Sequence, residues 1–149
     1  MSYNGFIVLT ATIFARKVPR NEFWDFSMNK ANRASETQKF VQKTILLTGA
    51  TGFLGSHLCT KLLEKGNHVT AFDNFYTGSK SNVSNLLSKD NFSLLDGDVT
   101  RVTNFDEKFD EIYNLACPAS PVHYQSKPVN TIKTNILGAI NLLNIAKDT

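Results

Sequence analysis

The most constraining feature of the chain is an apolar segment that runs into three evenly spaced glycines, within Thr44 to Gly55. In a phosphate-binding turn, Gly49 permits the tight turn, Gly52 lets the backbone approach a pyrophosphate, and Gly55 lets the next helix pack on the strand. The N-terminus of that helix then offers N–H groups and the positive end of its dipole to phosphates. The spacing G-x-x-G-x-x-G is a variant of the dinucleotide-binding fingerprint, so its context must support it.

A second strand and an acidic residue follow the glycines in the order that a dinucleotide site requires. Asn67 to Phe72 is predicted as a strand, and it ends at Asp73, eighteen residues after Gly55. A carboxylate there can accept hydrogen bonds from both hydroxyls of an adenosine ribose, and it would repel a 2′-phosphate. Since Asn74 to Tyr76 contains no arginine, the sequence favours NAD over NADP. The alternative is a chance coincidence of a glycine-rich turn and an Asp turn former.

The rest of the chain alternates between helix and strand patterns. We predict helices over Phe53–Lys65 and Pro128–Lys147, strands over Phe92–Leu95 and Glu111–Ala116, and short helices after Gly78 and over Phe105–Phe109. This alternation indicates an α/β fold, a Rossmann-type doubly wound parallel sheet with strand order 3-2-1-4. In the last helix, apolar residues form one face: Ile132, Ile136, Ile140, Leu143 and Ala146.

The fourth strand would lie at an edge of this sheet, although its sequence is typical of an interior strand. Tyr113 to Ala116 carries neither the charge nor the proline that usually protects an edge. Parallel strands normally have a neighbour and cover on both faces. We therefore expect the sheet to continue beyond Thr149, which makes this chain truncated after the fourth strand and its following helix. A complete small nucleotide-binding module is the alternative.

Length and composition favour one globular domain. A chain of 149 residues with 42% hydrophobic residues is long enough to bury a core. We place the domain at residues 43–149 and expect residues 1–42 to be a poorly ordered extension, because Asn29 to Gln42 is polar and mixed in charge. Within the extension, the apolar run Phe6 to Ala15 is too short to span a membrane. A cleaved targeting peptide is the alternative for this run.

Charge and cysteine usage argue against two other classes of partner. The net charge of +3 comes from basic residues spread along the chain, so no nucleic-acid partner is expected. Cys59 and Cys117 have no C-x-x-C neighbour, so no metal site is expected.

Two stretches are specific enough to indicate a family. Thr48 to Leu58 and Asp73 to Gly78 resemble the extended short-chain dehydrogenase/reductase family, which contains NAD-using sugar-nucleotide epimerases, dehydratases and decarboxylases. Within this family, Leu115 to Tyr124, followed by Pro128 to Asn135, is similar to the UDP-glucuronic acid decarboxylases. The resemblance runs from about Lys43 to Lys147 and covers the N-terminal half of such an enzyme.

The resemblance implies roles for residues of this chain. The expected cofactor is NAD, and the residues implied to bind it are Gly49, Gly52, Phe53, Leu54, Gly55, Asp73, Asn74, Tyr76, Thr77, Asp98, Val99, Leu115, Cys117 and Thr134. The implied partner is a UDP-sugar, UDP-glucuronate, which Lys133, Asn141 and Tyr124 would face. For Lys133, a solvated helix face is the alternative.

The resemblance also implies a proton-transfer pair that this chain lacks. The family has a Tyr and a Lys four residues apart on the helix after the fifth strand, where the Tyr takes a proton as the sugar C4 hydroxyl is oxidised. Tyr76 and Lys80 have this spacing, but they follow the second strand, with Gly78 between them, near the adenosine end of NAD. We therefore assign no catalytic residue and expect the chain alone not to convert UDP-glucuronate to UDP-xylose and carbon dioxide.

Three functions stay open at this point. The chain is part of a UDP-glucuronate decarboxylase, a non-catalytic NAD-binding regulatory module, or part of a related dehydratase or epimerase. A full-length enzyme of this kind is expected to be a homodimer. The resemblance implies a cytoplasmic location or, if the N-terminal extension belongs to a targeting segment, the Golgi lumen.

Overall fold

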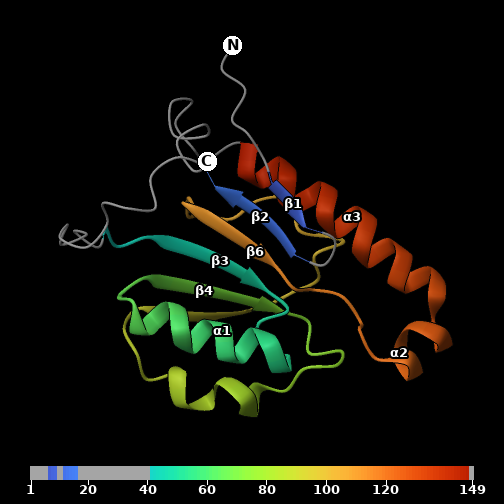
Figure 1. Ribbon diagram of the computed structural model, residues 1–149, viewed down its shortest axis with the longest axis horizontal. Helices are drawn as coiled ribbons and strands as arrows, with labels where there is room; N and C mark the ends of the chain where they lie inside the picture. Colours follow the sequence, from blue (N-terminus) through green and yellow to red (C-terminus); the bar gives the residue numbers. More distant parts are fainter. Residues whose placement is uncertain (1–6, 10–11, 17–40, 148–149) are drawn as a thin grey trace, which may run out of the picture.

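The centre of the fold is a parallel sheet of four strands. A computed structural model of the chain describes residues 7–9, 12–16 and 41–147 (Figure 1). Its parallel strands are β3 (Thr44–Thr48), β4 (His68–Asp73), β5 (Phe92–Asp96) and β6 (Glu111–Asn114). They lie in the order β5-β4-β3-β6, with Leu46 of β3 between Thr70 and Ile112. The predicted strand order 3-2-1-4 and the α/β Rossmann-type fold are therefore confirmed.

The outer edge of β6 is paired with a strand from the start of the chain, whereas the sequence analysis expected the neighbour of this strand to lie beyond Thr149. Strands β1 (Ile7–Leu9) and β2 (Thr12–Arg16) form an antiparallel hairpin, and β2 pairs antiparallel with β6 (Figure 1). The backbone hydrogen bonds of this pairing satisfy N–H and C=O groups that an edge strand would leave open. These two strands lie within residues 1–42, where no regular structure was predicted; the remainder of that segment up to residue 40 is outside the described residues.

Two layers of helix cover the sheet, one on each face. Because side chains alternate along β3, Ile45 and Leu47 belong to one buried cluster and Leu46 to the other. Helix α1 (Phe53–Glu64) and the 3-10 helix η2 (Lys80–Leu86) cover the first cluster. Helix α3 (Pro128–Lys147) covers the second, as the ribbon shows (Figure 1). None of the helices in the described ranges is long and apolar enough to cross a membrane.

Helix α3 has the predicted bounds but packs through a different face. Its buried residues are Gly138, Leu142 and Ile145, whereas the isoleucines at positions 132, 136 and 140 are 57%, 54% and 49% exposed. The close approach of the helix to the loop after β5 sets this rotation. A Cβ at Gly138 would lie 2.7 Å from a methyl group of Val99, and Asn141 Nδ2 donates to the Val99 carbonyl oxygen at 2.9 Å.

Two short elements differ from the prediction. Residues Phe105 to Phe109 form a loop and not a helix. Their rings instead make an aromatic chain, because Phe105 stacks edge-on against both Phe72 and Phe109, with ring centroids 5.3 and 5.4 Å apart. The short helix α2 (Pro121–Ser126), which the sequence analysis missed, begins after Ser120 with a proline in its first turn.

Candidate functional site

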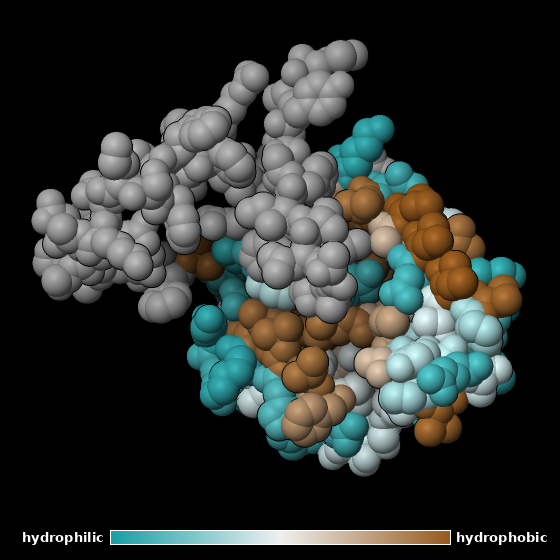
Figure 2. All heavy atoms as spheres, turned by 45° about the vertical axis from the view of Figure 1, so that its right-hand side comes forward, coloured by the Kyte–Doolittle hydropathy of each residue, from teal (hydrophilic) through white to brown (hydrophobic). Residues whose placement is uncertain are grey.

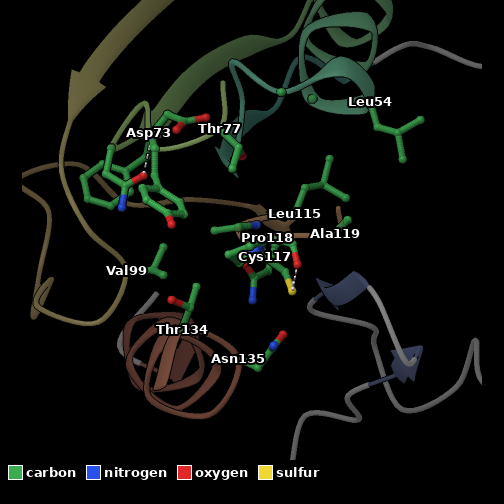
Figure 3. A pocket seen from close by; sticks show the side chains of 18 of the residues that line it. Leu54, Asp73, Thr77, Val99, Leu115, Cys117, Pro118, Ala119, Thr134 and Asn135 are labelled. Carbon is green, nitrogen blue, oxygen red and sulfur yellow. Dashed lines mark hydrogen bonds between the residues drawn. The ribbon is translucent and has the colours of Figure 1, made fainter. Parts of the chain in front are cut away.

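A cleft of about 620 Å³ opens where the carboxyl ends of β3, β4 and β6 meet (Figure 3). In open α/β sheets, ligands bind at this end of the strands, beside the point where the strand order reverses. Most of the predicted cofactor-binding residues line the cleft: Gly49, Gly52, Phe53, Leu54, Gly55, Asp73, Asn74, Tyr76, Thr77, Val99, Leu115, Cys117 and Thr134. Asp98 does not line it, although its neighbour Val99 does.

The glycine loop turns sharply from β3 into α1. Gly49 has a φ of +68°, and a Cβ there would lie 2.5 Å from the carbonyl group of Leu115. A Cβ at Gly55 would lie 2.2 Å from the Gly49 carbonyl oxygen, so these two positions are closed to any side chain. A Cβ at Gly52 would meet nothing closer than 3.4 Å. Gly52 therefore leaves a gap on the cleft side, at the N-terminus of α1, where a phosphate is favoured.

Asp73 lies at the end of β4 and is 9% exposed. Its Oδ2 accepts a hydrogen bond from the Thr51 backbone N–H at 2.8 Å, and its Oδ1 accepts one from the Phe75 N–H at 2.9 Å. An ionised carboxylate has about four acceptor sites, so both oxygens retain capacity for ribose hydroxyls. The bond to Phe75 also holds that residue at a φ of +56°, in the left-handed region.

Asp98 is held beside the cleft by the turn that follows β5. Partial burial alone would raise the pKa of its carboxyl group. Hydrogen bonds from the backbone and side chain of Thr100 and from the side chain of Asn74, with the charge of Arg101, outweigh burial and lower the pKa below its usual value. Asp98 is therefore an anion that orients Asn74, which itself lines the cleft.

The segment after β6 and helix α3 form two facing walls of the cleft. Figure 3 places Cys117 and Leu115 opposite Thr134 and Asn135 across the cleft. Asn114 fixes the start of this segment, because its Oδ1 accepts hydrogen bonds from Thr48 Oγ1 at 2.7 Å and from the Ala116 N–H at 3.2 Å.

Several residues of the cleft were missed in the sequence analysis: Phe72, Gly97, Asn114, Ala116, Pro118, Ala119, Ser120, Asn135 and Ala139. Those that end β4, β5 and β6 or follow them could have been found, because the carboxyl ends of parallel strands meet at one edge. Asn135 and Ala139 depend on the rotation of α3, which the sequence pattern predicted wrongly.

The three residues predicted to face a sugar nucleotide do not line the cleft. Lys133 is exposed on α3, and Tyr124 on α2 is 37% exposed. The side-chain amide of Asn141 donates to the Val99 carbonyl oxygen, which gives it a role in holding α3 to the sheet. Their predicted roles toward a substrate stay predictions.

Tyr76 and Lys80, which share the spacing of the family's proton-transfer pair, have different partners. Tyr76 lies against α2, with its ring 5.7 Å from the His123 ring and 5.4 Å from Lys127 Nζ. Lys80 Nζ instead lies 4.4 Å from the centre of the Phe75 ring. Tyr76 therefore connects the loop after β4 to α2 across the cleft. Among the described residues, no cluster of His, Cys, Asp or Glu could hold a metal ion.

Comparisons of the chain with known proteins all find sugar-nucleotide enzymes. The family model described as GDP-mannose 4,6 dehydratase matches residues 46–149. UDP-glucuronic acid decarboxylase 1 of Arabidopsis thaliana is 50% identical over 103 residues, which cover 69% of this chain and 23% of that protein. UDP-glucuronic acid decarboxylase 1 of Danio rerio is 46% identical over 106 residues, or 71% of this chain and 25% of that protein.

A solved structure has the same fold over the same share of the chain. The Thermus thermophilus UDP-glucose 4-epimerase in complex with NAD is 27% identical, with a TM-score of 0.55, and the match covers 70% of this chain and 34% of that one. The chain thus spans about a quarter to a third of the length of these proteins. Because the family model matches most of the chain, the protein belongs to the GDP-mannose 4,6 dehydratase family of extended short-chain dehydrogenases/reductases.

Proposed function

We propose that this domain binds NAD in the cleft at the carboxyl ends of β3, β4 and β6. The observation that supports this proposal most strongly is the geometry of the glycine loop. Gly49 and Gly55 have no space for a side chain, while Gly52 leaves a gap in front of the N-terminus of α1. A pyrophosphate needs this combination of a close backbone and unpaired N–H groups. The buried carboxylate of Asp73 beside the loop favours ribose hydroxyls over a 2′-phosphate.

Each part of NAD has matching residues in the cleft. Gly52, Phe53 and Leu54 would hold the pyrophosphate, and Asp73 with Asn74 would hold the adenosine ribose. Val99, which lines the cleft, would pack against the adenine, while the segment from Leu115 to Cys117 and Thr134 would contact the nicotinamide. When bound, NAD would accept a hydride on its nicotinamide ring.

We further propose that the protein acts on UDP-glucuronate as part of a decarboxylase that forms UDP-xylose and carbon dioxide through a 4-keto intermediate. The named decarboxylases at 46 to 50% identity support this substrate over that of a related dehydratase or epimerase. Tyr76 and Lys80 are the only Tyr and Lys four residues apart in the given sequence, and their side chains have different partners. We therefore expect this chain alone to bind NAD without turnover, which is also what a regulatory module would do.

The band of apolar side chains on α3 supports a homodimer. Ile132, Ile136 and Ile140 recur at every fourth position, each about half exposed, and Figure 2 shows this band on the molecular surface. Exposed apolar bands of this kind mark interaction surfaces. A cytoplasmic location, with the Golgi lumen as the alternative, stays a prediction.

Titration calorimetry of the purified chain with NAD and NADP tests the cofactor. We expect NAD to bind at least about tenfold more tightly than NADP, since a 2′-phosphate would meet the Asp73 carboxylate. The Gly52→Ala variant should fold normally, because its Cβ has space, and should lose NAD affinity by about tenfold because the methyl group enters the phosphate gap. The matched control is Gly66→Ala, in a turn at the far end of α1. Absence of NAD binding by the unaltered chain would refute the proposal.

The substrate is tested by incubating the chain with NAD and UDP-glucuronate. Mass spectrometry should detect no UDP-xylose with this chain and should detect it with a protein in which this domain is continued to the length of the matched decarboxylases. If such a protein left UDP-glucuronate unchanged and instead converted a nucleotide-linked hexose to a 4-keto-6-deoxy sugar or to an epimer, the dehydratase or epimerase alternative would replace the decarboxylase.

A further inference from the structure

Thr51 belongs to the glycine loop but faces away from the cleft, and its backbone is held from behind. Its N–H donates to Asp73 Oδ2 at 2.8 Å. Its carbonyl oxygen accepts two hydrogen bonds, from Asn82 Nδ2 at 2.8 Å and from the Ser79 N–H at 3.2 Å. The peptide units on both sides of Thr51 are therefore fixed by partners outside the glycine loop.

The side chain of Thr51 adds a steric contact to these bonds. It is fully buried, and its hydroxyl has no hydrogen-bond partner among the described residues. A Cβ at Gly78 would lie 2.2 Å from this hydroxyl oxygen and 2.8 Å from the Thr51 carbonyl carbon. The loop after β4 thus lies directly on Thr51, and only a glycine at position 78 allows this contact.

Asn82 reaches Thr51 from the 3-10 helix η2, which is anchored in the core. It lies in the first turn of η2, where its N–H donates to the Ser79 carbonyl oxygen at 3.0 Å. The next residue, Val83, is 0% exposed, and Leu86 in the same element is 1% exposed. Asn82 itself is exposed, and these buried neighbours hold the backbone from which its amide reaches Thr51.

We infer that Asn82 is a positioning residue for the cofactor site, although it does not line the cleft. By holding the Thr51 carbonyl group, Asn82 fixes the orientation of the peptide unit between Thr51 and Gly52, and so the backbone that faces the phosphate. The loop after β4, which would surround the ribose, and the glycine loop, which would hold the pyrophosphate, then form one unit joined at Thr51. This inference rests on the proposed function, because the cleft must bind NAD for the position of the loop to matter.

The effect of Asn82 should concentrate on ligands that contain a pyrophosphate. In the Asn82→Asp variant, a carboxylate of the same shape would face the Thr51 carbonyl oxygen with no proton to donate. In Asn82→Ala the donor is absent, and this milder variant serves if the first does not fold. The matched control is Asn85→Asp, which adds the same charge at an exposed position of the same 3-10 helix.

Affinities for NAD, ADP and adenosine are measured by calorimetry or ligand-observed NMR, with a melting temperature for each variant. We expect the Asn82 variants to bind NAD and ADP about tenfold more weakly, which is the effect of one lost hydrogen bond to a buried acceptor, and adenosine less than about twofold more weakly. Asn85→Asp should match the unaltered chain. An equal loss for adenosine and ADP, or unchanged NAD binding by folded Asn82→Ala, would overturn the inference. Failure of the unaltered chain to bind NAD would refute the proposed function itself.

Discussion

Replacing Gly55 with alanine tests whether this glycine is needed for the close packing of α1 against the glycine loop, since alanine is otherwise preferred over glycine in a helix. Gly55 is buried in the first turn of α1. A Cβ there would lie 2.2 Å from the Gly49 carbonyl oxygen and 2.8 Å from the Ala50 Cα. Both atoms belong to the backbone, so the new methyl group can be accommodated only if α1 moves away from the loop.

The expected change in the free energy of unfolding of the Gly55→Ala variant is the balance of two opposed effects. Alanine is favoured over glycine inside a helix by about 1 kcal/mol, whereas forcing a methyl group into a packed site lowers stability by about 3 kcal/mol when the neighbours are rigid. We expect the free energy of unfolding to fall by about 2 kcal/mol. The matched variant Gly66→Ala has no atom within 4 Å of the new Cβ, and only its left-handed backbone, with a φ of +80°, opposes the change. Its expected loss is about 1 kcal/mol.

Urea unfolding followed by circular dichroism at the helix band measures both variants. Gly55→Ala should also lose NAD binding, because the displaced helix carries the phosphate site with it, while Gly66→Ala should bind NAD like the unaltered chain. If Gly55→Ala were as stable as Gly66→Ala and retained full NAD affinity, α1 would not be pressed against the loop, and the reasoning would be wrong.

Three further outcomes are expected. Burial, with a smaller effect from the charge of Asp73, raises the pKa of the Cys59 thiol to about 12. Iodoacetamide at neutral pH should therefore label exposed Cys117 and not Cys59 in peptide mass spectra. Because Cys117 lines the cleft, NAD should slow its labelling. The pKa of Asp98 is lowered in the folded state, so its contribution to stability is present above the unfolded pKa and is lost as the pH falls below about 4. Asp98→Asn should therefore lose less stability than the unaltered chain when urea midpoints are compared at about pH 5 and pH 3. Thr51→Val removes a buried hydroxyl without a partner and should leave the free energy of unfolding unchanged or raise it by about 1 kcal/mol; a loss above that size would show that the hydroxyl is bonded.

Local patterns were sufficient to predict the parallel sheet and the glycine loop. The period of apolar residues and the glycines after the first strand of the domain identified α1, and the segment Asn67 to Phe72, which ends at Asp73, identified β4. These signals depend on residues only a few positions apart in sequence. The same helix or strand therefore forms in any tertiary structure that buries its apolar residues. The prediction of α3 succeeded in length for the same reason.

The orientation of α3 required the tertiary structure. The helix is apolar on more than one side, so periodicity could not decide between Ile136 and Leu142 as the buried residue. The choice was made by a close approach between Gly138 and Val99, residues that are far apart in sequence. This rotation also placed Asn135 in the cleft and left Lys133 outside it.

The amino-acid sequence by itself determined that a glycine turn between a parallel strand and a helix of the Rossmann type would form, because the spacing of the glycines and the apolar pattern of the strand act through local backbone geometry. Only the tertiary structure decided what supports that turn and the cleft beside it. The hydrogen bond from Asn82 to Thr51 joins residues 31 positions apart, and the contacts of Tyr76 with α2 cross the cleft. Such contacts depend on how the loops meet in space, since a side chain's partner across a long separation is set by packing and not by its neighbours in sequence.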